Sequence, residues 1–354
     1  MTNYQGTRWY KCDFHLHTTA SECFYDKNIT PDQWVQHALE KKLDCVAVTD
    51  HNTGTGIDGI IKATVVQTNE SFELDWRTIL PNEYVICGID RSDFGNQDAH
   101  TKKTIFDVSE IANKHGSIVI PAHIDDEYNS LKKLGFKVRN DFYCLEYINA
   151  VQIVKEEYLK KNIDLKNKMA ILTFSDNPHE LNSPKHGLWG IGEQYTWIKM
   201  DEDPNLESLR QAFLLPKFRV KNCFESENIP FEFPDLWIKS ISIKNTTITD
   251  DESPLIIEFS PQLTTIIGGR GSGKSSILRF LRGVFNKGID ASLEEILKDQ
   301  DDFYKKTDSD GKGVLNDGSA IEVIFYRKNS QYKIIATEIN DYNNQTIMIT
   351  KYNP

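Results

Sequence analysis

The pattern of hydrophobic and polar positions divides the chain into two parts. Up to about Pro216, short apolar runs alternate with amphipathic segments, which is typical of the strands and helices of a parallel β/α sheet or barrel. The predicted strands span residues 9–14, 45–49, 84–89, 117–123, 143–149, 169–175 and 196–200. The predicted helices span residues 31–42, 104–115, 127–134, 154–162 and 206–213. Thr30 as N-cap and Pro31 at the first helical position mark the start of the first helix.

A different pattern follows a polar, proline-containing stretch at 222–234. Apolar runs predict strands at residues 238–245, 255–260, 263–269, 320–328, 331–338 and 346–352, with a helix starting at Lys274. The polar segment 298–313 is expected to be a mobile loop. We therefore predict a first domain over residues 1–222, a linker over 223–237 and a second domain over 238–354.

Composition and charge narrow the class of protein. The 354 residues contain 39% hydrophobic residues, which is ordinary for a globular protein of two domains. With 41 Lys+Arg against 52 Asp+Glu the net charge is −11, so nucleic acid would have to bind at a local basic patch or at metal ions. Six scattered cysteines without a CxxC pair, no signal peptide and no apolar run of membrane-spanning length predict a cytoplasmic protein with no membrane partner.

Metal-ligating residue types follow the predicted strands. His15 and His17 are two residues apart at a strand end, so both side chains face one side and can bind one ion. Histidine and carboxylate ligands without cysteine suit zinc, manganese or iron in catalytic clusters. Two such ions about 4 Å apart can activate a water and stabilise the oxygens of a phosphoryl centre. Because these residues follow so many different strands, a barrel is favoured over an open sheet. They are His15, His17, His51, Glu83, His100, His123, Asp176 and His179.

The motifs DFHLHT, TDHN, LPNE, DAH, PAH and FSDNPH occur in this order, and residues 10 to about 215 resemble a PHP (polymerase and histidinol phosphatase) domain. The resemblance implies a distorted seven-stranded β/α barrel, two or three divalent metals and phosphoesterase chemistry. It places His15, His17, Glu83 and Asp176 around one ion, and Glu83 with His100 and His123 around a second. A third ion would be held by Glu22, His51 and His179.

The chain departs from the family pattern at Glu22, where Asp or His is common, at Glu83, which follows Pro-Asn, and at SDNPH, which is one residue longer than D-x-H. Asp50 is expected to orient His51. Lys185 and His186 follow the last motif, and either a contact with substrate phosphate or a plain surface loop fits them.

A phosphate-binding motif, GxxxxGK[ST], begins at Gly268, between a predicted strand and a predicted helix. Backbone N–H groups and the helix N-terminus bind phosphates in such a loop, while Lys274 reaches the β- and γ-phosphates and Ser275 ligates Mg²⁺. The motif therefore predicts ATP with magnesium as ligand. The predicted binding residues are Gly268, Gly269, Arg270, Gly271, Ser272, Gly273, Lys274, Ser275 and Ser276.

The surroundings of this motif resemble the N-terminal lobe of ABC-type ATPases of the SMC/RecF kind. Neither a Walker B run nor an LSGG-type signature precedes Pro354. We expect that the protein continues beyond this residue and dimerises through the ATPase lobe; the alternative is a lobe that binds ATP without hydrolysing it. The order of the two parts resembles TrlF-type proteins, which are suspected ATP-regulated nucleases, some of them in phage defence.

The leading hypothesis is a metal-dependent phosphodiesterase, a nuclease acting on DNA or RNA, whose activity is regulated by ATP binding. One alternative is a phosphomonoesterase for a small metabolite, similar to histidinol phosphatase. The other is a nucleotide-dependent DNA-binding or scaffold protein with a structural metal site.

Overall fold

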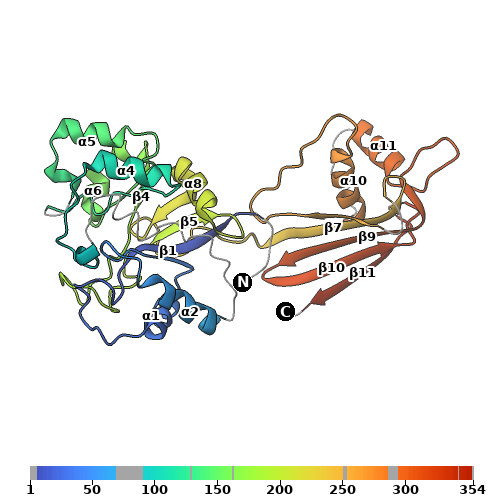
Figure 1. The fold of residues 1–354 in the computed structure, drawn as a ribbon. Helices are drawn as coiled ribbons and strands as arrows, with labels where there is room; N and C mark the ends of the chain where they lie inside the picture. Colours follow the sequence, from blue (N-terminus) through green and yellow to red (C-terminus); the bar gives the residue numbers. More distant parts are fainter. Residues whose placement is uncertain are drawn as a thin grey trace. The chain divides into compact units, whose positions relative to one another are not determined.

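The fold was analysed in a computed structural model that describes residues 6–68, 91–127, 130–161, 163–249, 253–285, 294–341 and 343–352. The chain divides into two compact units: one spans Thr7–Phe231 and the other begins at Glu232. Both combine helices with sheets, so the mixed α/β class is confirmed (Figure 1). None of the described helices is long and apolar enough to cross a membrane.

The first unit contains two sheets. The larger has the strand order β2 (Cys45–Val48), β1 (Arg8–Leu16), β5 (Thr196–Met200), β6 (Val220–Asn222). β1 is parallel to β2, whereas β5 runs antiparallel to both β1 and β6. The smaller sheet pairs β3 (Ala150–Gln152) with β4 (Ala170–Leu172) in parallel. The described residues contain no closed barrel. The strands predicted at 9–14, 45–49, 169–175 and 196–200 form, and they lie in these two separate sheets.

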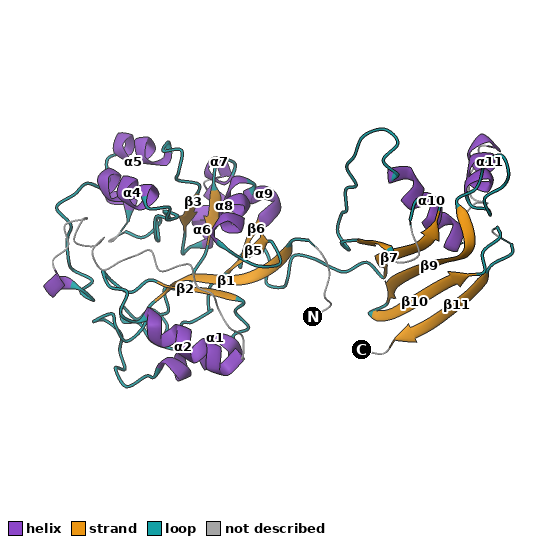
Figure 2. Cartoon of the chain, turned by 45° about the vertical axis from the view of Figure 1, so that its right-hand side comes forward, coloured by secondary structure: helices purple, strands orange, loops and turns teal. Residues whose placement is uncertain are grey.

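Helices lie on both sides of the larger sheet, with α1 and α2 on one side and α4, α5, α6 and α8 on the other (Figures 1 and 2). The helices are α1 (Pro31–Glu40), α2 (Ile57–Thr68), α4 (Ile105–Lys114), α5 (Phe136–Tyr143), α6 (Glu156–Lys161), α7 (Ile163–Lys166), α8 (Leu206–Leu214) and α9 (Pro216–Arg219). Short 3₁₀ helices span Arg91–Asp93 and Leu131–Lys133.

Helix α1 begins as its sequence predicts. The Thr30 side chain accepts a hydrogen bond from the Gln33 backbone N–H, and the Gln33 side chain accepts one from the Thr30 N–H, which forms a capping box. The helix buries Trp34 against the sheet side, and the Trp34 indole N–H donates to the backbone oxygen of His17 at 3.0 Å. A predicted helix therefore supports a residue of the candidate site directly.

The strand predicted at 117–123 does not form. Its apolar residues are nevertheless used, because Ile118 and Ile120 pack against one hydrophobic cluster and Val119 packs against another. Only two backbone hydrogen bonds join this region to β3 among the described residues. The Gln152 N–H donates to the Pro121 oxygen, and the Ile124 N–H donates to the Gln152 oxygen. The segment is thus partly buried on both sides, but it lacks the hydrogen-bonded ladder that defines a strand.

The strand predicted at 143–149 is also wrong, because this segment contains the end of α5 and a turn, and β3 starts only at Ala150. Its apolar side chains pack in the cluster around α5 and β3 without forming a sheet. The predicted strand at 84–89 lies outside the described residues.

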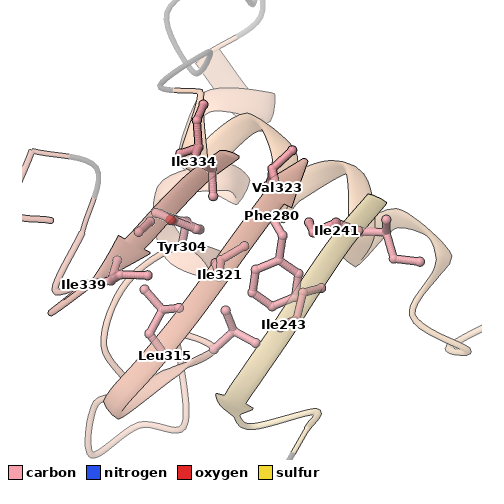
Figure 3. Packing of buried hydrophobic residues seen from close by; sticks show 13 residues of the cluster. Ile241, Ile243, Phe280, Tyr304, Leu315, Ile321, Val323, Ile334 and Ile339 are labelled. Atoms are coloured by element: carbon pink, nitrogen blue, oxygen red, sulfur yellow. The ribbon is translucent and has the colours of Figure 1, made fainter. Parts of the chain in front are cut away.

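The second unit is a five-stranded antiparallel sheet with two helices on one side of it (Figures 1 and 2). The strand order is β11 (Thr346–Tyr352), β10 (Ser330–Thr337), β9 (Leu315–Arg327), β7 (Leu236–Thr246), β8 (Leu255–Glu258). The helices are α10 (Lys274–Val284) and α11 (Glu294–Phe303). Phe280 of α10 packs onto Ile241, Ile243 and Ile321 of the sheet, and Figure 3 shows this core.

Two predictions fail in this unit. No strand forms at 263–269, where Leu263 and Ile267 are 81% and 90% exposed, because no neighbouring strand pairs with this segment among the described residues. The segment 298–313 is not simply a loop, since α11 extends to Phe303 and Tyr304 is fully buried. The Tyr304 ring lies against Gly283 of α10, so a residue in the supposed loop belongs to the core.

Candidate metal centre and phosphate loop

Histidines and one aspartate converge just beyond the strand ends of the first unit. His15 and His17 lie at the end of β1, His51 follows β2, and Asp176 follows β4. The ligand atoms of His15, His17 and Asp176 lie within 4.8 Å of one another, as do those of His17, His51 and His186. Parallel pairing of β1 with β2 and of β3 with β4 explains why distant residues meet at one edge.

The tautomer of His15 is fixed by a buried amide. Gln152 uses its side-chain N–H to donate to the Phe174 backbone oxygen at 3.3 Å, so its Oε1 faces His15 and accepts from Nδ1–H at 2.7 Å. The His15 Nε2 lone pair is therefore directed at Asp176 Oδ1, 3.3 Å away.

The tautomer of His17 is fixed by a chain of hydrogen bonds. Ser21 donates its hydroxyl proton to Asp50 Oδ1 at 2.7 Å, so Ser21 Oγ accepts from His17 Nδ1–H at 3.1 Å. Asp50 also accepts from the Thr18 backbone N–H and hydroxyl. Asp50 thus orients His17 through Ser21, whereas the sequence analysis expected it to orient His51.

His17 Nε2 then meets the same carboxylate oxygen, Asp176 Oδ1, at 3.0 Å. Two imidazole lone pairs and a carboxylate oxygen face one another, and such a group requires protons or a cation between its members. Burial lowers the pKa of His17, which disfavours the protonated form. This group of atoms fits a divalent metal ion.

His186 completes the cluster from a different segment. Its Nδ1–H donates to the backbone oxygen of Asp176 at 2.8 Å, which leaves Nε2 available as a ligand. Its ring stacks on that of His17 with centroids 3.8 Å apart. Burial is the main cause that lowers the pKa of His186 to about 4, and the neighbouring His17 lowers it further. The imidazole is therefore neutral at pH 7.

Two histidines beside His15 and His17 carry a buried ring nitrogen without a hydrogen-bond partner among the described residues: His51 Nε2 and His123 Nδ1. Burial lowers the pKa of both side chains. The ring centroids of His51 and His17 lie 4.5 Å apart, and those of His123 and His15 lie 5.7 Å apart. An unpaired nitrogen buried next to a ligand cluster is costly in free energy and is satisfied when it binds a metal.

Two residues of this region have a strained backbone. Asp176 and His123 have φ values of 54° and 32°, in the left-handed region that non-glycine residues rarely adopt. Such conformations cost about 1–3 kcal/mol each and persist only where the surroundings hold them. At Asp176 the hydrogen bond from His186 Nδ1–H holds the backbone oxygen, and the side-chain oxygen Oδ1 faces His15 Nε2 and His17 Nε2.

The remaining predicted ligands lie elsewhere or outside the described residues. His179 stacks on Tyr25, with centroids 3.7 Å apart, and is in neither ligand group. Glu22 and His100 are exposed and are also outside these groups. Glu83 lies outside the described residues. The structure therefore brings together His15, His17, His51 and Asp176, places His123 beside them, and adds His186 in the position expected for His179.

The residues of the predicted phosphate-binding motif form a glycine-rich loop in the second unit. Lys274 Nζ donates to the backbone oxygens of Gly268 and Gly269, both at 2.6 Å, and the loop wraps around this ammonium group. Gly271 and Gly273 have φ values of 80° and 82°, which favour glycine. A Cβ atom at Gly268 would lie 2.4 Å from the Ser272 hydroxyl oxygen.

Helix α10 starts directly after this loop. Its N-cap is Gly273, and no side chain caps its first N–H groups. Arg270 and Ser275 are exposed, while the Ser276 N–H donates to the Gly273 oxygen at 3.0 Å. Free N–H groups at a helix N-terminus next to a lysine ammonium are the chemistry that binds phosphate.

No protein-family model matches the chain, and no curated protein matches it either. The chemistry of the sites therefore rests on their own geometry. That geometry is a partly buried group of histidines and one aspartate, compatible with a divalent metal, and a glycine-rich loop next to a lysine.

Proposed function

We propose that the first unit is a metal-dependent phosphodiesterase that cleaves nucleic acid. The observation that carries this proposal is the convergence of His15 Nε2 and His17 Nε2 on one oxygen of Asp176. The order of the motifs that resemble the PHP family supports the same interpretation of the cluster. ATP with Mg²⁺ is the proposed ligand of the phosphate loop and the proposed regulator of cleavage.

Each residue of the cluster has a proposed task. His15, His17 and Asp176 would hold one ion, and His51 with His186 would hold a second. Such ions supply Lewis-acid stabilisation of a phosphoryl oxygen and lower the pKa of a water to about 7. Gln152, Ser21 and Asp50 keep the histidine Nε2 atoms unprotonated and directed inward. A nucleophilic Ser or Cys is not needed in this chemistry.

The test measures metal content and diester hydrolysis together. We expect the purified protein to contain zinc, manganese or iron and to hydrolyse DNA, RNA or bis-p-nitrophenyl phosphate. The double substitution His15→Ala with His17→Ala should abolish both, whereas His37→Ala with His115→Ala, which removes two histidines outside the cluster, should retain both. Unchanged cleavage in the first double variant would exclude the metal mechanism. Faster turnover of p-nitrophenyl phosphate than of the diester would favour a phosphomonoesterase.

The assignment of His186, in place of His179, as a metal ligand is tested separately by the number of metal ions bound per chain. His186→Ala should lower the number of ions bound per chain, because it removes a buried ligand nitrogen. His179→Ala should leave that number unchanged, because His179 lies outside both ligand groups. Metal loss only in His179→Ala would restore the ligand set that the family resemblance implies.

A further inference from the structure

An exposed aromatic stack lies next to the proposed metal centre. Tyr25 is 56% exposed, and its ring is nearly parallel to that of His179, with an interplanar angle of 10° and centroids 3.7 Å apart. Gly187 makes room for this arrangement, since a Cβ atom there would lie 2.9 Å from the His179 Cα atom. The Tyr25 ring is therefore exposed to solvent, and the His179 ring holds it in place from one side.

Backbone hydrogen bonds connect this stack to the metal centre. The Tyr25 N–H donates to the His186 oxygen at 2.8 Å, and the His186 N–H donates to the Cys23 oxygen at 3.2 Å. The His179 N–H donates to the Lys185 oxygen at 2.7 Å. The same paired segments therefore place the His186 ring inward, against His17, and the Tyr25 ring at the surface.

Lys185 brings positive charge to this surface. Lys185 Nζ lies 5.4 Å from the centroid of the Tyr25 ring, and Lys185 forms no ion pair with any residue that the structure describes. The chain as a whole has a net charge of −11, so a polyanion needs a local cation such as Lys185.

We propose that Tyr25, His179 and Lys185 form a platform that binds a base and a phosphate of single-stranded nucleic acid next to the metal centre. An unpaired base can stack on the Tyr25 ring, and the Lys185 ammonium can bind a flanking phosphate. A duplex offers no free base face, which selects single strands. The platform would bind the substrate of the proposed nuclease, so this inference rests on the proposed function.

The test measures binding of fluorescein-labelled hexathymidylate to the full chain by anisotropy, in EDTA so that cleavage does not contribute. Tyr25→Ala should weaken binding by about 5- to 100-fold, the loss typical for one stacked base, while Tyr25→Trp retains affinity. Lys185→Ala should reduce the slope of log affinity against log salt by about one. Phe136→Ala is the matched control, because Phe136 is 72% exposed and has the Arg139 guanidinium 6.0 Å from its ring centroid.

Equal binding by the wild type, Tyr25→Ala and Phe136→Ala would overturn the platform, as would a wild type that does not bind the oligonucleotide. If Tyr25→Ala does not fold, Tyr25→Leu replaces it: equal affinity of the Leu and Trp variants overturns the proposal, and loss only with Leu supports it. Diester hydrolysis distinguishes the two proposals. A wild type that binds hexathymidylate but hydrolyses no diester contradicts the proposed function and leaves the platform supported.

Discussion

The two candidate sites are built in opposite ways. The metal centre collects residues from distant parts of the first unit, and Gln152, Ser21 and the Asp176 backbone orient its rings. The phosphate loop is a run of consecutive residues, largely exposed, whose lysine is bonded to the loop's own oxygens. The fold assembles the first site, whereas the local chain conformation assembles the second. Substitutions in supporting residues should therefore affect the first site more.

The largest effect is expected at the phosphate loop itself. Lys274→Ala removes both the cation and the group that the loop wraps around, so ATP binding should fall below detection. Metal content should not change, because the metal centre belongs to the other unit. Calorimetric titration with ATP and Mg²⁺, combined with metal analysis, measures both, and Lys298→Ala, an exposed lysine of α11, is the control. Loss of metal in Lys274→Ala would mean that the two sites are not separate.

A residue that touches no metal should matter at the metal centre. Ser21→Ala removes the oxygen that accepts from His17 Nδ1–H and the donor that Asp50 holds. Loss of such supporting hydrogen bonds typically lowers metal affinity by about 10- to 100-fold. Competition with a chromophoric chelator measures the affinity. The control is Ser226→Ala, at a serine outside the cluster whose hydroxyl donates to the Asn228 backbone oxygen. Equal affinities for the two variants would contradict the role given to Ser21.

The smallest effect is expected from a substitution in the core of the second unit, which should change its stability. A methyl group at Gly283 would lie 2.2 Å from the Tyr304 ring, so Gly283→Ala should reduce stability by about 1–3 kcal/mol, the typical cost of overpacking. Hydrogen exchange measured by mass spectrometry should show reduced protection in α10 and β9 and unchanged protection in α1. The control is Arg282→Ala, at the exposed neighbouring position. Reduced protection in α1 would indicate that the two units unfold together.

The sequence predicts elements well where the signal is local. Helix α1 starts at Pro31 because Thr30 and Gln33 cap it, and helix α10 starts at Lys274 because glycines precede it. Apolar runs were less reliable. Residues 117–123 and 143–149 are apolar because they pack in hydrophobic clusters, and burial without a hydrogen-bonded neighbour does not make a strand. Tyr304 was missed because its polar surroundings hide a buried aromatic residue.

The sequence predicts only those residues of the candidate metal centre that follow a predicted strand. His15, His17, His51 and Asp176 were identified because they follow predicted strands. His186 follows an irregular loop. Its links to the cluster are a hydrogen bond to the Asp176 backbone oxygen and the stacking on the His17 ring, and no sequence pattern records these tertiary contacts. His179 stands near the expected spacing, yet its ring faces Tyr25. A position in the chain could not reveal which of these two histidines turns inward.

The pairing around His186 has an evolutionary consequence. The Gly187 N–H donates to the Asn177 oxygen and the His179 N–H donates to the Lys185 oxygen, so the intervening residues form a loop closed at its base. Within that loop Glu180 and Leu181 are exposed. Insertions or deletions there would leave the ligands of the cluster in place. The spacing between Asp176 and His186 can therefore change while the candidate metal ligands stay in place, and a search based on a fixed spacing would overlook such a sequence.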